Sequence, residues 1–174
     1  MKKSPSRRSG IFRAVFCMLC LGVLGMSSAQ PDKLKKRKQR KYLPKALTIR
    51  DGYIGVDKAQ LFETFPKARE VEMTSDFREI VKLGPLDPPI KVAYAYVEIE
   101  GDEKSVYEYV LVIEDSTDPL ELAREYWGAP NTEDGEWHFK PEDTGLKFQL
   151  AGWTFENKII IAANLPGSEW QSGF

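Results

Sequence analysis

Six strand-like segments separated by short connections constrain the fold more than any other feature of this chain. They are FREIVKL (77–83), KVAYAYVEI (91–99), VYEYVLVIE (106–114), EWHFK (136–140), LKFQLAGWTF (146–155) and KIIIAANL (158–165). Most of the connections are rich in Gly, Pro, Asp and Asn, which are typical of tight turns. Strands joined this closely pair antiparallel, because a parallel pair needs a long crossover. We therefore expect an antiparallel sheet.

Two short helices are expected beside the sheet. VDKAQLFETFP (56–66) has Asp57 in the N-cap position, and DPLELAREYWGAPN (118–131) has Asp118 in the same role. Gly128 ends the second helix, since glycine adopts the left-handed conformation that often follows a last helical turn. The conspicuous residues of 118–131 therefore have structural explanations as helix caps and an apolar stripe.

The two helices also indicate an internal duplication. Asp57, Leu61 and Phe65 match Asp118, Leu122 and Tyr126 at a constant offset of 61 residues. Three of the strands follow each helix, so a helix and three strands occur twice, over residues 47–114 and 115–170. The first half opens with a further short strand at 47–50. The predicted fold is α+β in two layers, with the helices packed on one face of the sheet.

The first 29 residues have the pattern of a cleavable secretory signal. A basic start is followed by the apolar run Ala14–Met26, then by the small residues Ser27 and Ala29. The run is shorter than the roughly 20 residues of a membrane-spanning helix. Both cysteines lie in the signal without a preceding lipobox, so we expect a disulfide-free protein in the periplasm or the extracellular space.

A basic segment follows the signal, over residues 30–41, and is expected to be a flexible arm because it has no apolar periodicity. Its cations are Lys33, Lys35, Lys36, Arg37, Lys38, Arg40 and Lys41. Three readings remain open: a solvated tether, a dibasic processing site, and an arm that binds an anionic membrane, envelope polymer or nucleic acid. Such an arm is able to fold back on an acidic domain.

The remaining residues, 42–174, form one expected domain of opposite charge. They contain 13 Lys and Arg against 25 Asp and Glu, a formal net charge of −12, whereas the whole chain has −1. Nucleic-acid binding by this domain is not expected, since such domains carry a basic surface.

Part of the pattern resembles known families. A capped helix that ends before a proline, then a three-stranded meander with Trp137 and Phe139 in its first strand, resembles the small envelope lipoproteins of the outer-membrane assembly type. Tandem copies are similar to the β-lactamase inhibitory protein fold. This chain lacks the lipidated cysteine of the first group and the disulfides of the second. The resemblance implies protein–protein binding rather than catalysis.

Motifs for catalysis are sparse. His138 is the one histidine, it is expected to point outward from its strand, and no G-x-S-x-G segment accompanies it. With one histidine and no cysteine after the signal, no catalytic residue, metal site or cofactor is expected. A secreted hydrolase with paired strand carboxylates stays open as an alternative, as does a carrier of a small apolar ligand. The candidate carboxylates are Glu98, Glu100, Glu108 and Glu114.

Strand alternation predicts a second sheet face that is unusually apolar. Small residues such as Ala93 and Ala95 are expected under the helices, with Tyr107 and Tyr109 beside them. The residues left on the opposite face are Tyr94, Tyr96, Val110, Val112 and Trp153. An apolar patch ringed by charges is typical of an interface. The sequence thus predicts an exported, non-catalytic module that binds a protein partner or a second copy here, unless the segment 166–174 or 42–50 covers the patch.

Overall fold

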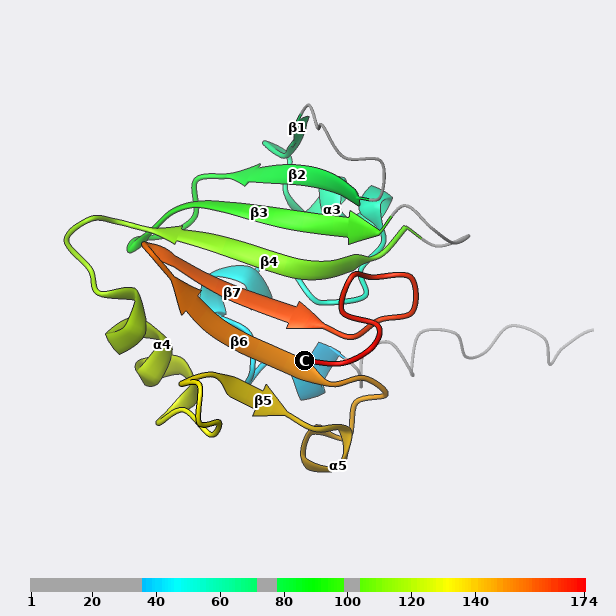
Figure 1. Cartoon of the computed structure of the whole chain (residues 1–174). Helices are drawn as coiled ribbons and strands as arrows, with labels where there is room; N and C mark the ends of the chain where they lie inside the picture. Colours follow the sequence, from blue (N-terminus) through cyan, green and yellow to red (C-terminus); the bar gives the residue numbers. More distant parts are fainter. Residues whose placement is uncertain (1–35, 72–77, 99–103) are drawn as a thin grey trace, which may run out of the picture.

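A computed structural model describes residues 36–71, 78–98 and 104–174, and it shows an α+β protein (Figure 1). Seven antiparallel strands form one sheet in the order β1-β2-β3-β4-β7-β6-β5. The strands are β1 (Arg69–Val71), β2 (Arg78–Gly84), β3 (Ile90–Glu98), β4 (Val106–Ile113), β5 (Trp137–Phe139), β6 (Leu150–Phe155) and β7 (Lys158–Ala163). The helices are α2 (Lys45–Thr48), α3 (Lys58–Thr64), α4 (Pro119–Trp127) and α5 (Pro141–Thr144). The predicted class and the antiparallel sheet are confirmed.

The sheet consists of two meanders joined through their last strands. Strands β2, β3 and β4 follow α3, and strands β5, β6 and β7 follow α4, with β4 paired to β7 at the centre. Within the part of the chain that the structure describes, the short edge strand β1 and helix α5 have no counterpart in the other half. The duplication over 47–114 and 115–170 stays a prediction from sequence.

The core lies between the helices and one face of the sheet. Ala93 and Ala95 of β3 are buried there, together with Leu61 of α3 and Leu122 of α4. Gly152 of β6 permits the close approach of α4, because a Cβ at this position would lie 2.7 Å from the Trp127 ring. The small residues of the sheet therefore determine how closely the helices pack.

Both helix starts follow the predicted caps. The Asp57 carboxylate accepts a hydrogen bond from the Gln60 amide at 2.8 Å, and the Asp118 carboxylate accepts one from the Leu120 amide at 2.8 Å. Gly128 follows α4 with a φ of 79°. These bonds satisfy amides that have no acceptor within the helix.

The strand expected at 47–50 is wrong, because helix α2 occupies this part of the chain. Pro44 has a φ of −51°, and its carbonyl accepts hydrogen bonds from the Leu47 and Thr48 amides. Proline before a first turn favours helix, since its φ is already fixed near the helical value. Leu47 is fully buried, so one turn of helix suffices to bring it into the core.

The predicted flexible arm also needs correction. Residues 36–39 are helical, and Gln39 is only 2% exposed. The Gln39 side chain exchanges two hydrogen bonds with the backbone of Ile54, at 2.9 and 3.0 Å. Lys38 donates to the Gly145 carbonyl and Arg40 to the Tyr53 hydroxyl. An amide with both groups paired can be buried, and this anchors 36–41 on the domain.

The rest of the arm, including Lys33 and Lys35, lies outside the described residues, as do the signal segment 1–29 and Glu100. In the described ranges, none of the helices has the length and apolarity needed to cross a membrane.

Candidate functional site

The five residues predicted for the second face lie on one face of the sheet, opposite the helices. Tyr94 of β3 pairs with Val110 of β4, Val110 pairs with Ile160 of β7, and Ile160 pairs with Trp153 of β6. Directly paired residues of antiparallel strands share a face. Tyr96 and Val112 lie on either side of this row. The two faces were assigned correctly from alternation for these residues.

The C-terminal segment 164–174 covers one half of this face. Figure 1 shows it (red) returning from the end of β7 across to β6. The Trp170 ring lies 5.4 Å from the Trp153 ring and 5.4 Å from the Phe174 ring, and Phe174 reaches His138 at 5.8 Å. Trp153 is therefore covered by the chain's own C-terminus, one of the two alternatives that the sequence left open.

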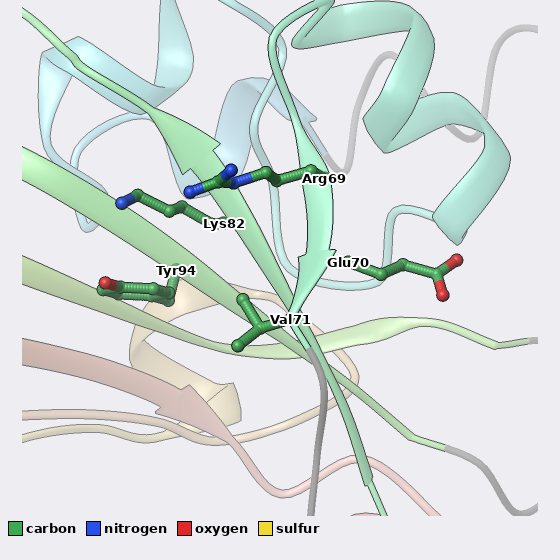
Figure 2. A pocket seen from close by; sticks show the side chains of 5 residues that line it. All are labelled: Arg69, Glu70, Val71, Lys82 and Tyr94. Atoms are coloured by element: carbon green, nitrogen blue, oxygen red, sulfur yellow. The ribbon is translucent and has the colours of Figure 1, made fainter.

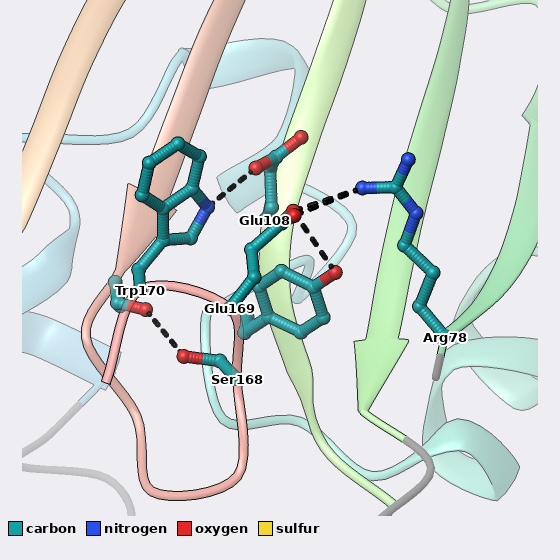
Figure 3. Close-up of polar contacts among 7 residues, drawn as sticks. Arg78, Glu108, Ser168, Glu169 and Trp170 are labelled. Atoms are coloured by element: carbon teal, nitrogen blue, oxygen red, sulfur yellow. Dashed lines mark hydrogen bonds and ion pairs between the residues drawn. The ribbon is translucent and has the colours of Figure 1, made fainter. Parts of the chain in front are cut away.

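Polar contacts fix this segment on the sheet (Figure 3). The Trp170 indole donates a hydrogen bond to the Glu108 carboxylate at 2.8 Å. The Arg78 guanidinium donates from one nitrogen to both oxygens of Glu169, at 2.9 and 3.2 Å. The Tyr107 hydroxyl also donates to Glu169, at 3.3 Å. We call Glu108, Trp153, Glu169 and Trp170, with Arg78 and Tyr107, the covered half.

Burial changes the acidity of the groups beneath the segment. Glu108 is only 6% exposed, and burial raises its pKa to about 7, while the bond from Trp170 and the charge of Arg78 act in the opposite direction. Burial also raises the pKa of Tyr107, and the charge of Glu169 adds to this effect. The charged form of a carboxyl is disfavoured where water is excluded.

Tyr107 lies on this face and not under the helices, which corrects the sequence prediction. Val97 pairs with Val106 and Tyr96 pairs with Glu108, so Tyr107 is an extra residue on β4. Such a β-bulge turns the inserted residue and the next one toward the same side. Strict alternation fails at this point, and Tyr107 reaches Glu169 beside Glu108.

The other half of the face has no such cover among the described residues. Its apolar members are half-buried or exposed: Val71, Ile80, Val92, Tyr94, Tyr96 and Val112. We call these residues, together with Arg69 and Lys82, the open half. The Arg78 guanidinium lies 4.9 Å from the centre of the Tyr96 ring, at the border between the two halves.

A depression of about 320 Å³ lies within the open half (Figure 2). Arg69, Val71, Lys82 and Tyr94 point to this side of β1, β2 and β3, while Glu70 points away. The Glu70 carboxylate lies 2.6 Å from the Lys58 amine instead. Arg69 and Lys82 are directly opposite each other in the ladder, and neither forms an ion pair with another described residue.

Arg69 and Lys82 are absent from the sequence-based site. Strand β1 has three residues, too few for periodicity to reveal it. Lys82 was recognisable, because it alternates with the buried Val81 and Leu83. Its position between two core residues indicates that its side chain lies on the sheet face of Tyr94 and Tyr96, which we call the tyrosine face.

Three of the candidate carboxylates, Glu98, Glu108 and Glu114, lie in the described residues. Glu98 and Glu108 are both buried, and the Trp170 indole donates a hydrogen bond to Glu108. His138 is half-buried beside Glu136 at 3.1 Å. Across residues 36–71, 78–98 and 104–174, no three His, Asp or Glu side chains come together as metal ligands.

Comparisons with protein-family models, with curated proteins and with solved structures find no match to this chain. The resemblance to envelope lipoproteins and to the inhibitory fold therefore stays a prediction.

Proposed function

We propose that this chain is an exported, non-catalytic module that binds a protein partner, or a second copy of itself, through the open half. The observation that carries the proposal is the composition of this surface. Tyr94, Tyr96 and Val112 remain in contact with water, and the cations Arg69 and Lys82 lie at one side. Protein interfaces are enriched in aromatic residues and arginine, with a polar rim around an apolar centre.

The covered half supports the proposal. The chain places its own C-terminal segment over the neighbouring part of the same face, where two tryptophans and a phenylalanine pack together. Aromatic contacts already cover one half of this face, so the open half of the same face is suited to accept similar contacts. Since a solvated face of an antiparallel sheet is ordinarily polar, the open half fits a surface that is buried in a complex.

The basic segment extends the proposal to the cell envelope. Arg37, Arg40 and Lys41 are exposed although their segment is anchored to the domain. Cations that cluster on a protein surface attract anionic lipids and polymers, an effect that salt screens. We therefore include an anionic membrane or envelope polymer as a second contact of an exported protein.

Site-specific photo-crosslinking tests the proposal. A photoreactive residue is placed at Tyr94, at Val112 or, as the control, at Ile49, which is 57% exposed at the end of α2. Irradiation of host cells is expected to yield a crosslinked protein from positions 94 and 112 and none from 49. Equal yields from all three positions, or no product together with a monomeric purified chain, would contradict the proposal.

A further inference from the structure

We infer that the partner segment seated on the open half carries a carboxylate next to an aromatic side chain. The carboxylate lies between Arg69 and Lys82, and the aromatic ring packs on Tyr94. This inference rests on the proposed function, because it names the chemistry of the partner for the same surface. It follows from three separate features of the described residues.

The first feature is a pair of cations that no carboxylate of the described residues compensates. Arg69 and Lys82 are direct cross-strand partners, an arrangement in which like charges destabilise a sheet. No described carboxylate forms an ion pair with either side chain, and the nearby Glu70 is bound to Lys58. Over residues 42–174, acids outnumber bases by 25 to 13, so two cations on one depression without a described carboxylate beside them are unexpected. An anionic group from outside would remove the repulsion.

The second feature is the apolar surface next to these cations. Val71 and Tyr94 line the same depression, and the Tyr94 ring is half-buried (Figure 2). Tyr94 continues into the row formed by Val110 and Ile160. A free inorganic anion would leave this apolar surface in water. A ligand with an aromatic ring beside its carboxylate would cover both parts, since aromatic pairs add stabilisation beyond the area they bury.

The third feature is the way in which the chain covers the other half. Glu169 and Trp170 are consecutive, and the carboxylate of Glu169 accepts hydrogen bonds from Arg78 (Figure 3). The Trp170 ring contacts Trp153. An acidic residue followed by an aromatic residue is thus the pair that this face already binds within the molecule. The open half offers the same two partners, a cation and a ring, on strands of the same sheet.

Two synthetic peptides serve as probes, acetyl-GEWEG-amide and its neutral counterpart acetyl-GQWQG-amide. Each is titrated into the isotope-labelled chain as its host produces it, and the backbone amide signals are followed by NMR. The acidic peptide is expected to shift the signals of Val71, Lys82 and Tyr94 and to bind about tenfold more tightly than the neutral peptide. Equal affinities, or shifts centred elsewhere, overturn the inference.

Substitutions assign the charge preference to the two cations. The double variant R69Q/K82Q is expected to bind the acidic peptide about tenfold more weakly and the neutral peptide unchanged. The control is K45Q, which removes an exposed lysine at the start of α2. Equal losses in K45Q and in the double variant would show that only the net charge matters, and this also overturns the inference.

Failure of the inference and failure of the proposed function are distinguishable. Crosslinking from position 94 reports contact whatever the charge of the partner. A crosslink that forms equally well in R69Q/K82Q keeps the proposed function and overturns the acidic-aromatic partner, whether the captured protein is foreign or a second copy. A crosslink that the double substitution abolishes, together with the peptide preference, supports both.

Discussion

The two halves of the tyrosine face belong to one sheet, yet they differ in cover. Charged groups and aromatic rings of the covered half contact the C-terminal segment, and the described ones of the open half do not. In the covered half, Glu169 is bound to Arg78 and the Trp170 ring contacts Trp153. In the open half, Arg69 and Lys82 oppose each other without a carboxylate from the described residues, and Tyr94 is half-buried. The difference lies in residues 164–174, which cover one half only. This difference supports the proposal that an acidic and aromatic segment from outside the chain binds the open half.

The burial of Glu108 is the most sensitive test of this comparison. Its pKa is raised from 4.5 to about 7 in the folded protein, so the fold binds more protons than the unfolded chain between these values. The contribution of Glu108 to the free energy of unfolding therefore falls as the pH rises from about 4.5 to about 7, by about 3 kcal/mol. E108Q keeps an acceptor for the Trp170 indole and loses this titration.

Chemical denaturation at several pH values measures the effect. E108Q is expected to match the wild type at about pH 4.5 and to become more stable than it toward pH 7, by about 3 kcal/mol. The difference between the two proteins isolates Glu108, because the remaining groups titrate in both. Parallel curves would mean that the C-terminal segment does not exclude water from this carboxylate, and the two halves would then differ much less.

Removal of the covering ring is the next test. W170A loses the contacts with Trp153 and Phe174 and leaves the buried Glu108 without its donor. Because Trp170 is only half-buried, we expect a loss of about 2 kcal/mol in the free energy of unfolding. The matched variant in the open half is Y94A, for which we expect about 1 kcal/mol. Urea unfolding followed by circular dichroism measures both, and equal losses would contradict a difference in cover.

Much of the fold was predictable from local patterns. Alternation located the regions of β2, β3, β4 and β7, and capping residues located α3 and α4, because these signals depend on neighbouring residues only. The patterns failed where the determining contact is distant. Residues 36–39 are helical beside Ile54, and the bulge at Tyr107 depends on how β4 pairs with β3.

The residues of the site were predictable from the sequence, but not which of them are covered by another part of the chain. All five predicted residues lie on the expected face, yet their exposure is decided by residues far away in sequence. Trp170 and Glu108 are 62 positions apart, and Glu169 and Arg78 are 91 positions apart. Arg69 of the open half was missed because β1 consists of three exposed residues, whereas Lys82 of β2 was recognisable from alternation. A strand of the length of β1 is too short for a local sequence pattern to predict it.

A double-mutant cycle on Arg78 and Glu169 sharpens the charge side of the comparison. Both side chains are about 30% exposed, and the guanidinium contacts both carboxylate oxygens. After allowance for screening by water, we expect a favourable coupling of about 1 kcal/mol between R78Q and E169Q. The same cycle on R69Q and K82Q is expected to give a coupling of opposite sign, because two like charges face each other. Thermal or urea unfolding supplies the values, and couplings of the same sign would contradict the comparison.

The smallest expected effect concerns Lys82 alone, and it separates a structural cation from a binding one. K82E places a carboxylate opposite Arg69, so the cross-strand repulsion becomes an attraction, and we expect stability to rise by about 0.5 kcal/mol. The same substitution should abolish the preference for the acidic peptide, which gives the variant a stability gain and a binding loss together. If Lys82 instead stabilised the fold, its replacement would lower the free energy of unfolding. A loss of stability in K82E would therefore contradict the inference that Lys82 binds a carboxylate from a partner.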